Sequence, residues 1–129
     1  MFSATRRRPL MFAALAVALC APLAAMAQAW PSRSIKIIVP FPPGNASDVA
    51  ARTLGDELSK KVGQPVVIEN RTGATGTIGA AAVAKSPPDG YTLLMTSTSF
   101  AISTALMANL PYSVTADFEP VVQVGGSGA

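Results

Sequence analysis

Short apolar runs alternate with longer amphipathic or small-residue segments along most of the chain, and this alternation sets the expected architecture. Each run is rich in β-branched or aromatic residues and is bounded by proline, glycine or polar residues, which is typical of strands. Strands are expected at Ile35–Val39, Val66–Ile68, Tyr91–Met95 and Val121–Val124. Helices are expected at Asp48–Val62, Ile78–Lys85 and Ala101–Met107.

The first helix carries the clearest signal. Its apolar positions recur every three or four residues, at Ala51, Leu54, Leu58 and Val62. Ser47 or Asp48 offers the N-cap oxygen, and Gly63 ends the helix. In the second helix, the small residues from Gly79 to Ala82 should allow close packing on a sheet. Strands that alternate with helices predict an α/β fold, with a parallel sheet covered by helices on both faces.

Three loops follow strands and lead into helices, at 40–47, 70–77 and 96–100. In open parallel sheets, ligands bind beyond the carboxyl ends of the strands. A helix that starts there directs unpaired backbone N–H groups at an anion, and Ser97, Thr98 and Ser99 add hydroxyl donors. The pattern predicts a small anion held mainly by neutral donors. Asp48 would repel an anion, so we expect it to be structural or to bind an amine of the ligand.

The glycine-rich segment Thr72–Gly79 provides an alternative, because it resembles the dinucleotide fingerprint of short-chain dehydrogenases. Three observations weigh against a nicotinamide-dependent oxidoreductase. Glu69–Arg71 separates the apolar strand from the glycines, and the next strand ends in Thr96 and Ser97 without an acid for a ribose hydroxyl. Exported proteins also seldom meet nicotinamide cofactors. A secreted interaction module without a ligand is a third hypothesis.

The N-terminal segment has the pattern of a signal peptide over residues 1–29. Arg6–Arg8 precede an apolar run at Leu10–Leu19, and small residues favour cleavage after Ala27 or Ala29. The apolar run is too short to span a bilayer, which requires about 20 residues. General secretion and twin-arginine export both remain open. We therefore expect an exported protein.

Removal of this leader changes the charge and the available chemistry. The chain has 10 Lys and Arg against 7 Asp and Glu, and three of the ten are Arg6–Arg8, which leaves seven against seven. A mature chain of zero net charge gives no reason to expect nucleic acid as a partner. Cys20, the single cysteine, would be lost, and no histidine is present. We therefore expect no catalytic residues, no metal site and no cofactor.

Several motifs, taken in order along the chain, carry a resemblance to a known family. They are Trp30–Ile35, Val39–Asp48, Gly63–Arg71, Gly73–Gly76, Ala84–Leu94, Leu110–Tyr112 and Asp117–Phe118. In these segments the chain resembles the periplasmic solute receptors of tripartite tricarboxylate transporters, the Bug or TctC-like family.

The resemblance implies a type II periplasmic-binding-protein fold, in which two α/β domains close over a small carboxylate. Residues 30–129 would form the N-terminal part of the first domain, truncated and without the second. The resemblance also implies a periplasmic monomer that performs no chemistry and delivers its ligand to membrane permease subunits. Gly44–Asn45 stands where the family usually has two glycines, and asparagine tolerates left-handed φ. The ligand residues implied by position are Pro43, Gly44, Asn45, Ala46, Ser47, Asp48, Ser97, Thr98 and Ser99.

Overall fold

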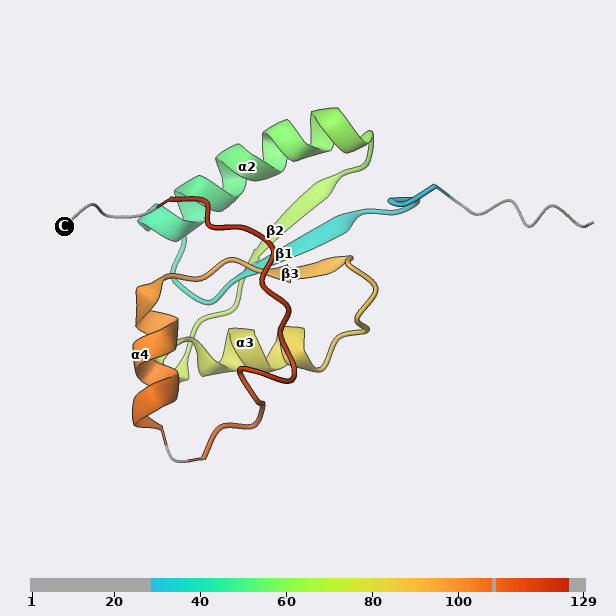
Figure 1. Ribbon diagram of the computed structural model, residues 1–129. Helices are drawn as coiled ribbons and strands as arrows, with labels where there is room; N and C mark the ends of the chain where they lie inside the picture. Colours follow the sequence, from blue (N-terminus) through green and yellow to red (C-terminus); the bar gives the residue numbers. More distant parts are fainter. Residues whose placement is uncertain (1–28, 108, 126–129) are drawn as a thin grey trace, which may run out of the picture.

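The computed structural model describes residues 29–107 and 109–125, which form a small parallel sheet between helices (Figure 1). The three strands are β1 (Ile35–Val39), β2 (Val66–Asn70) and β3 (Thr92–Leu94), in the order β2-β1-β3. Both pairings are parallel, and Ile37 lies opposite Ile68 on one side and Leu93 on the other. The predicted α/β class and parallel sheet are confirmed.

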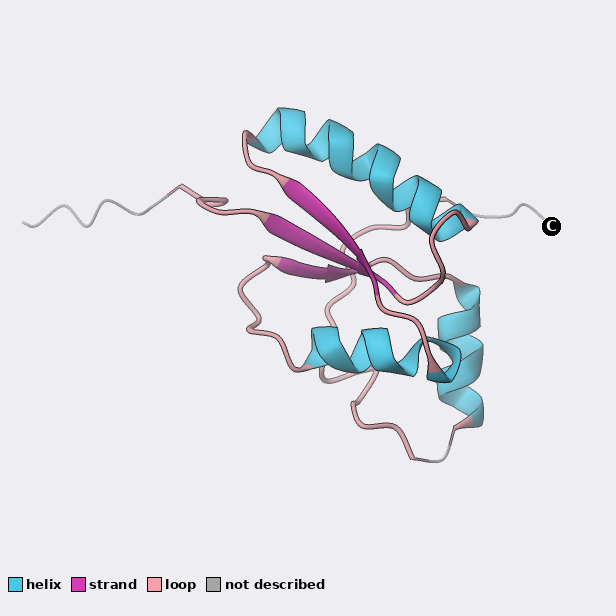
Figure 2. Cartoon of the chain, turned by 180° about the vertical axis from the view of Figure 1, so that it is seen from behind, coloured by secondary structure: helices cyan, strands magenta, loops and turns pink. Residues whose placement is uncertain are grey.

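Helices cover both faces of the sheet. Helix α2 (Ala46–Val62) lies on one face and α3 (Thr77–Ala84) on the other, while α4 (Thr98–Leu106) packs near the carboxyl ends of the strands (Figures 1 and 2). A short turn, η1 (Ala74–Gly76), precedes α3. The described part of the chain contains no helix with the length and apolar character needed to cross a bilayer. The predicted signal peptide falls almost entirely on residues 1–28, outside the described residues, and stays a prediction.

The core is centred on β1, the middle strand. Ile37 and Val39 are buried in one cluster with Ala51 of α2. Because side chains alternate along a strand, Ile38 points to the opposite face, which α3 covers, and it is also fully buried. An almost continuous apolar run is therefore what a central strand with helices on both sides requires.

Helix α3 approaches the sheet closely at Gly79. A Cβ atom added there would lie 2.8 Å from the carbonyl oxygen of Arg71 and 2.9 Å from Cβ of Pro40. Both distances are shorter than van der Waals contact, so only glycine fits. The expectation that small residues let this helix lie close to the sheet is confirmed.

Helix α4 is held by a cluster of three aromatic rings. Phe100 of α4 stacks on Tyr112 at 6.2 Å and meets Phe118 edge-on at 5.8 Å, while Tyr112 and Phe118 are 5.5 Å apart. Edge-to-face and offset contacts of this kind stabilise packing beyond their buried area. The irregular segment after α4 therefore fixes the orientation of this helix.

The predicted strand at Val121–Val124 is wrong. This segment is not a strand in the structure, and Val121 and Val122 are 78% and 73% exposed. A β-branched run becomes a strand only when a neighbour completes its hydrogen bonds, and this segment pairs with none of the described strands. Some element boundaries also differ from those predicted. Strand β2 continues to Asn70, β3 is one residue shorter at each end, and α4 begins three residues earlier than expected.

Candidate ligand-binding site

The topology gathers the three predicted loops at one edge of the sheet. Parallel strands end on the same side, and two backbone bonds join the loops to β1 there. The Arg71 N–H donates to the Val39 carbonyl oxygen and the Met95 N–H to the Ile38 carbonyl oxygen, each at 2.9 Å. The chain leaves β1 for β2 on one side and returns to β3 on the other. The loops after β1 and β3 therefore flank the change in strand order, where ligands bind in such sheets.

The loop after β1 enters α2 through an asparagine cap. Asn45 has extended backbone angles (φ −76°, ψ 171°), and its Oδ1 accepts a hydrogen bond of 2.8 Å from the Asp48 N–H. The expectation that Ser47 or Asp48 caps the helix was wrong, because both already lie inside α2. The turn does not use the tolerance of asparagine for a left-handed φ, because Gly44 takes that conformation instead, with φ 86°.

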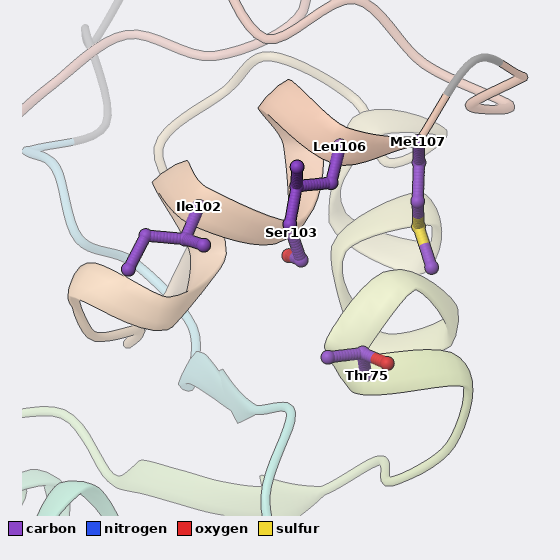
Figure 3. Close-up of a pocket in the computed structure, with 5 residues that line it drawn as sticks. All are labelled: Thr75, Ile102, Ser103, Leu106 and Met107. Carbon is purple, nitrogen blue, oxygen red and sulfur yellow. The ribbon is translucent and has the colours of Figure 1, made fainter.

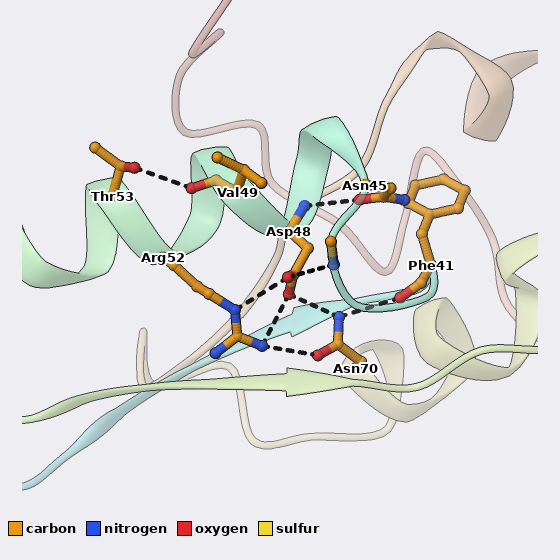
Figure 4. Close-up of polar contacts among 8 residues, drawn as sticks. Phe41, Asn45, Asp48, Val49, Arg52, Thr53 and Asn70 are labelled. Atoms are coloured by element: carbon orange, nitrogen blue, oxygen red, sulfur yellow. Dashed lines mark hydrogen bonds and ion pairs between the residues drawn. The ribbon is translucent and has the colours of Figure 1, made fainter.

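The Asp48 carboxylate is the centre of a buried polar cluster, shown in Figure 4. The residue is 2% exposed. Its Oδ2 accepts from the Gly44 N–H at 2.8 Å and from Arg52 Nε at 3.0 Å. Its Oδ1 accepts from Arg52 Nη2 at 3.0 Å and from Asn70 Nδ2 at 2.9 Å. The carboxylate is thus fully occupied inside the protein.

The same contacts fix the charge of this cluster. The Arg52 guanidinium, followed by the Gly44 N–H and the Asn70 amide, holds the pKa of Asp48 far below its usual range, against the opposing effect of burial. The carboxylate in turn raises the pKa of Arg52. The pair therefore stays ionised and neutral overall, and the repulsion expected between Asp48 and an anion is cancelled locally. This arrangement gives Asp48 a structural role; a contact with the ligand stays a prediction.

The donors that remain are next to this cluster. The Gly44 and Asp48 amides are used by side chains, whereas the Ala46 and Ser47 N–H groups have no acceptor within the part of the chain that the structure describes. They are the first two amides of a 17-residue helix. Unpaired amides at this position, at the positive end of the helix dipole, are suited to an anion.

The loop after β3 is shorter than predicted. Ser97 is the N-cap of α4, in extended conformation, so Thr98 and Ser99 lie in the first helical turn and not in a loop. Their hydroxyl character suggested a loop, but the aromatic cluster around Phe100 holds this segment as helix. Just before it, the Thr96 hydroxyl oxygen is buried without a hydrogen-bond partner among the described residues. Ser97 and Thr98 are exposed at the same edge as Ala46 and Ser47.

The glycine-rich turn after β2 has a left-handed backbone. Ala74 and Thr75 have φ 45° and 55°, between Gly73 at 123° and Gly76 at 92°. Because β2 runs to Asn70, only Arg71 and Thr72 separate the strand from these glycines. The separation between strand and glycines is thus smaller than the sequence suggested, and this argument against a dinucleotide site is weaker. The absence of an acid after β3 still holds.

Two shallow hollows lie elsewhere on the described surface. One, of about 280 Å³, lies between η1 and α4 (Figure 3). It is lined by Thr75, Ile102, Ser103, Leu106 and Met107. The other, of about 350 Å³, is lined by Arg71, Thr77, Ile78, Ala81, Ala82, Lys85 and Pro111. Neither of these two hollows includes a predicted ligand residue. No group of acidic or cysteine side chains suited to a metal occurs within the described residues.

Sequence reasoning missed Arg52 and Asn70. The spacing of Asp48 and Arg52, four residues apart on a helix, could have suggested their ion pair. Asn70 carries no comparable signal, because its partners lie 18, 22 and 29 residues away in sequence.

Comparison with known proteins gives consistent matches. The family model TctC, described as the tripartite tricarboxylate transporter family receptor, matches residues 50–129. Protein BugT of Bordetella pertussis (strain Tohama I) is 52% identical over 101 residues, which cover 77% of this chain and 31% of BugT. This chain therefore spans about a third of the length of that relative.

Two solved structures are also similar. A structure described as a periplasmic transporter is 50% identical with a TM-score of 0.50, and the match covers 51% of this chain and 22% of the other. MatC from Rhodopseudomonas palustris, solved with bound malate, is 45% identical with a TM-score of 0.49, over 50% of this chain and 22% of MatC.

Proposed function

Because this chain belongs to the TctC family of tripartite tricarboxylate transporter receptors, we propose that it contributes the first wall of a site that captures a small carboxylate for transport. The family is one of transporter receptors, not of enzymes. The observation that carries the proposal is that the Ala46 and Ser47 amides, at the carboxyl edge of a parallel sheet, have no acceptor among the described residues.

The donors at this edge suit a carboxylate, because amide and hydroxyl hydrogens are available for both of its oxygens. One oxygen would accept from the Ala46 and Ser47 N–H groups at the N-terminus of α2, where the aligned peptide dipoles favour negative charge. Hydroxyl groups of Ser47, Ser97 and Thr98 would bind the second oxygen directly or through ordered water. Pro43, Gly44 and Asn45 shape the loop, and Asp48 with Arg52 keeps it neutral.

Export, domain organisation and partners belong to the same proposal. Residues 1–29 would direct export to the periplasm, with cleavage after Ala27 or Ala29. Residues 30–129 would then form part of the first domain of a two-domain receptor. The ligand would pass to membrane permease subunits, and the receptor would act as a monomer.

The test is a titration of the ¹⁵N-labelled full chain with L-malate, adipate and citrate, followed by amide chemical shifts. Sodium chloride at matched ionic strength is the control. We expect saturable shifts centred on Ala46, Ser47 and Thr98 at millimolar acid, since a site with one wall binds weakly. The absence of saturable shifts with all three acids would contradict the proposal, and saturable shifts with NADH in their place would favour the oxidoreductase.

One variant isolates the amide at the first helical position. Ala46→Pro removes that N–H, and proline is well tolerated at the first position of a helix. The extended backbone of Asn45 is also compatible with a following proline. Ala46→Pro should therefore stay folded and lose at least tenfold in affinity, whereas the matched variant Ala46→Ser keeps the N–H and the affinity.

A further inference from the structure

We propose that Asn70, at the carboxyl end of β2, is a positioning residue that sets the shape of the anion-binding loop without touching the ligand. The inference rests on the proposed function of that loop. Asn70 is the last residue of β2 and pairs in register with Val39 of β1. Its side chain is thus carried by the rigid sheet and not by the loop itself.

The Asn70 side-chain amide donates two hydrogen bonds, one to the loop after β1 and one to α2. Nδ2 donates to the Phe41 carbonyl oxygen at 3.1 Å and to Asp48 Oδ1 at 2.9 Å (Figure 4). A carboxamide nitrogen has two hydrogens, so no donor is left for a carboxylate ligand. Oδ1 accepts from Arg52 Nη2 at 3.1 Å, and an oxygen acceptor has no attraction for an anion. Asn70 is therefore equipped to hold the loop and not the ligand.

Asn70 acts on the Ala46 and Ser47 amides indirectly, through the Asp48 carboxylate and its bond to the loop. Asn70 fixes the Asp48 carboxylate, whose Oδ2 holds the Gly44 N–H at 2.8 Å. The Asp48 N–H is held in turn by Asn45 at 2.8 Å. These two bonds fix the residues on either side of Ala46 and Ser47. Arg52 also binds the carboxylate, but its side chain is 51% exposed and comes from the same helix, so it does not connect α2 to the sheet as directly.

Asn70→Asp tests this role with little change in size. Both donors are replaced by a carboxylate that faces the Phe41 carbonyl oxygen and the Asp48 carboxylate, so the loop should be repelled from β2. Asn109→Asp, at an exposed position outside the cluster, adds the same charge and is the matched control. Asn70→Ser is the milder variant, because it keeps a polar donor and introduces no charge.

The measurements are the L-malate titration at pH 7 and the hydrogen exchange of the Gly44 amide without ligand. We expect at least tenfold weaker malate binding by Asn70→Asp, an intermediate loss by Asn70→Ser, and affinity within twofold of wild type for Asn109→Asp. Exchange of the Gly44 amide should accelerate at least tenfold in Asn70→Asp, while amide shifts of β1 and the end of α2 stay unchanged. If Asn70→Asp does not fold, Asn70→Ser carries both measurements.

The outcomes separate this inference from the proposed function. Wild-type malate affinity in Asn70→Asp would overturn the positioning role and leave carboxylate capture intact. Failure of the wild-type chain to bind any of the three acids would overturn the proposed function, and the ligand-based part of this inference with it. In that case, unchanged Gly44 exchange in Asn70→Asp would also show that Asn70 does not hold the loop.

Discussion

The close approach of α3 to the sheet predicts opposite outcomes for two glycine-to-alanine substitutions. Gly55 in α2 and Gly79 in α3 are both buried and both lie inside helices. In each, alanine favours the helix by about 1 kcal/mol. The difference lies in what the new methyl group meets.

At Gly79 the neighbours cannot move. The methyl carbon would lie 2.8 Å from a backbone carbonyl oxygen and 2.9 Å from the Pro40 ring, so α3 must shift off the sheet. Overpacking of this kind costs about 1–3 kcal/mol. Because the contact is with backbone, we expect a cost in the upper part of that range, about 2–3 kcal/mol. The gain in helix propensity offsets about 1 kcal/mol of it, so Gly79→Ala should lower the free energy of unfolding by about 1–2 kcal/mol.

At Gly55 the neighbours are atoms of two side chains and not backbone. The methyl carbon would lie 3.1 Å from Cδ1 of Ile68, which can rotate away, and 3.3 Å from Cγ1 of Val66. The helix gain and the packing cost are then of similar size, and Gly55→Ala should stay within about 0.5 kcal/mol of wild type.

Urea denaturation followed by circular dichroism distinguishes the two variants. With a slope of about 1–1.5 kcal/mol per molar urea, typical of small domains, Gly79→Ala should lower the midpoint by about 1 M. Gly55→Ala should leave it nearly unchanged. A Gly79→Ala variant as stable as wild type, at the same slope, would refute the claim that Arg71 and Pro40 leave no room beside α3.

Three further predictions concern Thr75, Asn45 and Asp48, which lie in or next to the loops. Thr75→Gly should raise the free energy of unfolding by about 0.5–1 kcal/mol. Glycine removes the strain of a left-handed threonine, and this gain exceeds the cost of the greater freedom of glycine in the unfolded chain; a lower urea midpoint would contradict this. Asn45→Ala should lower the free energy of unfolding by about 1 kcal/mol, because the helix cap is lost. Asn45→Asp keeps a capping oxygen and should leave this free energy nearly unchanged in the same assay. The depressed pKa of Asp48 means that its stabilising effect is complete above its ordinary pKa of 3.8 and is lost as pH falls towards the folded value. Asp48→Asn should therefore be less stable at pH 7 and lose less stability than wild type between pH 4 and 2, as measured by thermal unfolding.

The sequence was sufficient for those elements whose evidence is local. The apolar run of β1 and the stripe of α2 identify a central strand and the helix that covers it, and Gly63 ends α2 in the left-handed conformation expected of a C-cap. Parallel pairing then places the three loops at one edge without further information.

What the sequence could not supply depends on distant partners or on backbone angles. Asn45, Ser47 and Asp48 are all good N-cap residues, and only the backbone angles decide that Asn45 is the cap. The role of Asn70 depends on contacts with residues 18 to 29 positions away. Val121–Val124 has strand composition, but composition does not provide a neighbouring strand.

The neutral pair of Asp48 and Arg52 has a consequence for how capture should respond to acidity. Backbone amides and hydroxyl groups do not change charge near neutral pH, and the two ionised side chains beside them have pKa values displaced away from that range. The described side of the binding edge therefore presents the same charge in mildly acidic and mildly alkaline surroundings. If this edge binds a carboxylate as proposed, any change in affinity between mildly acidic and mildly alkaline pH should follow the ionisation of the ligand and not that of the protein.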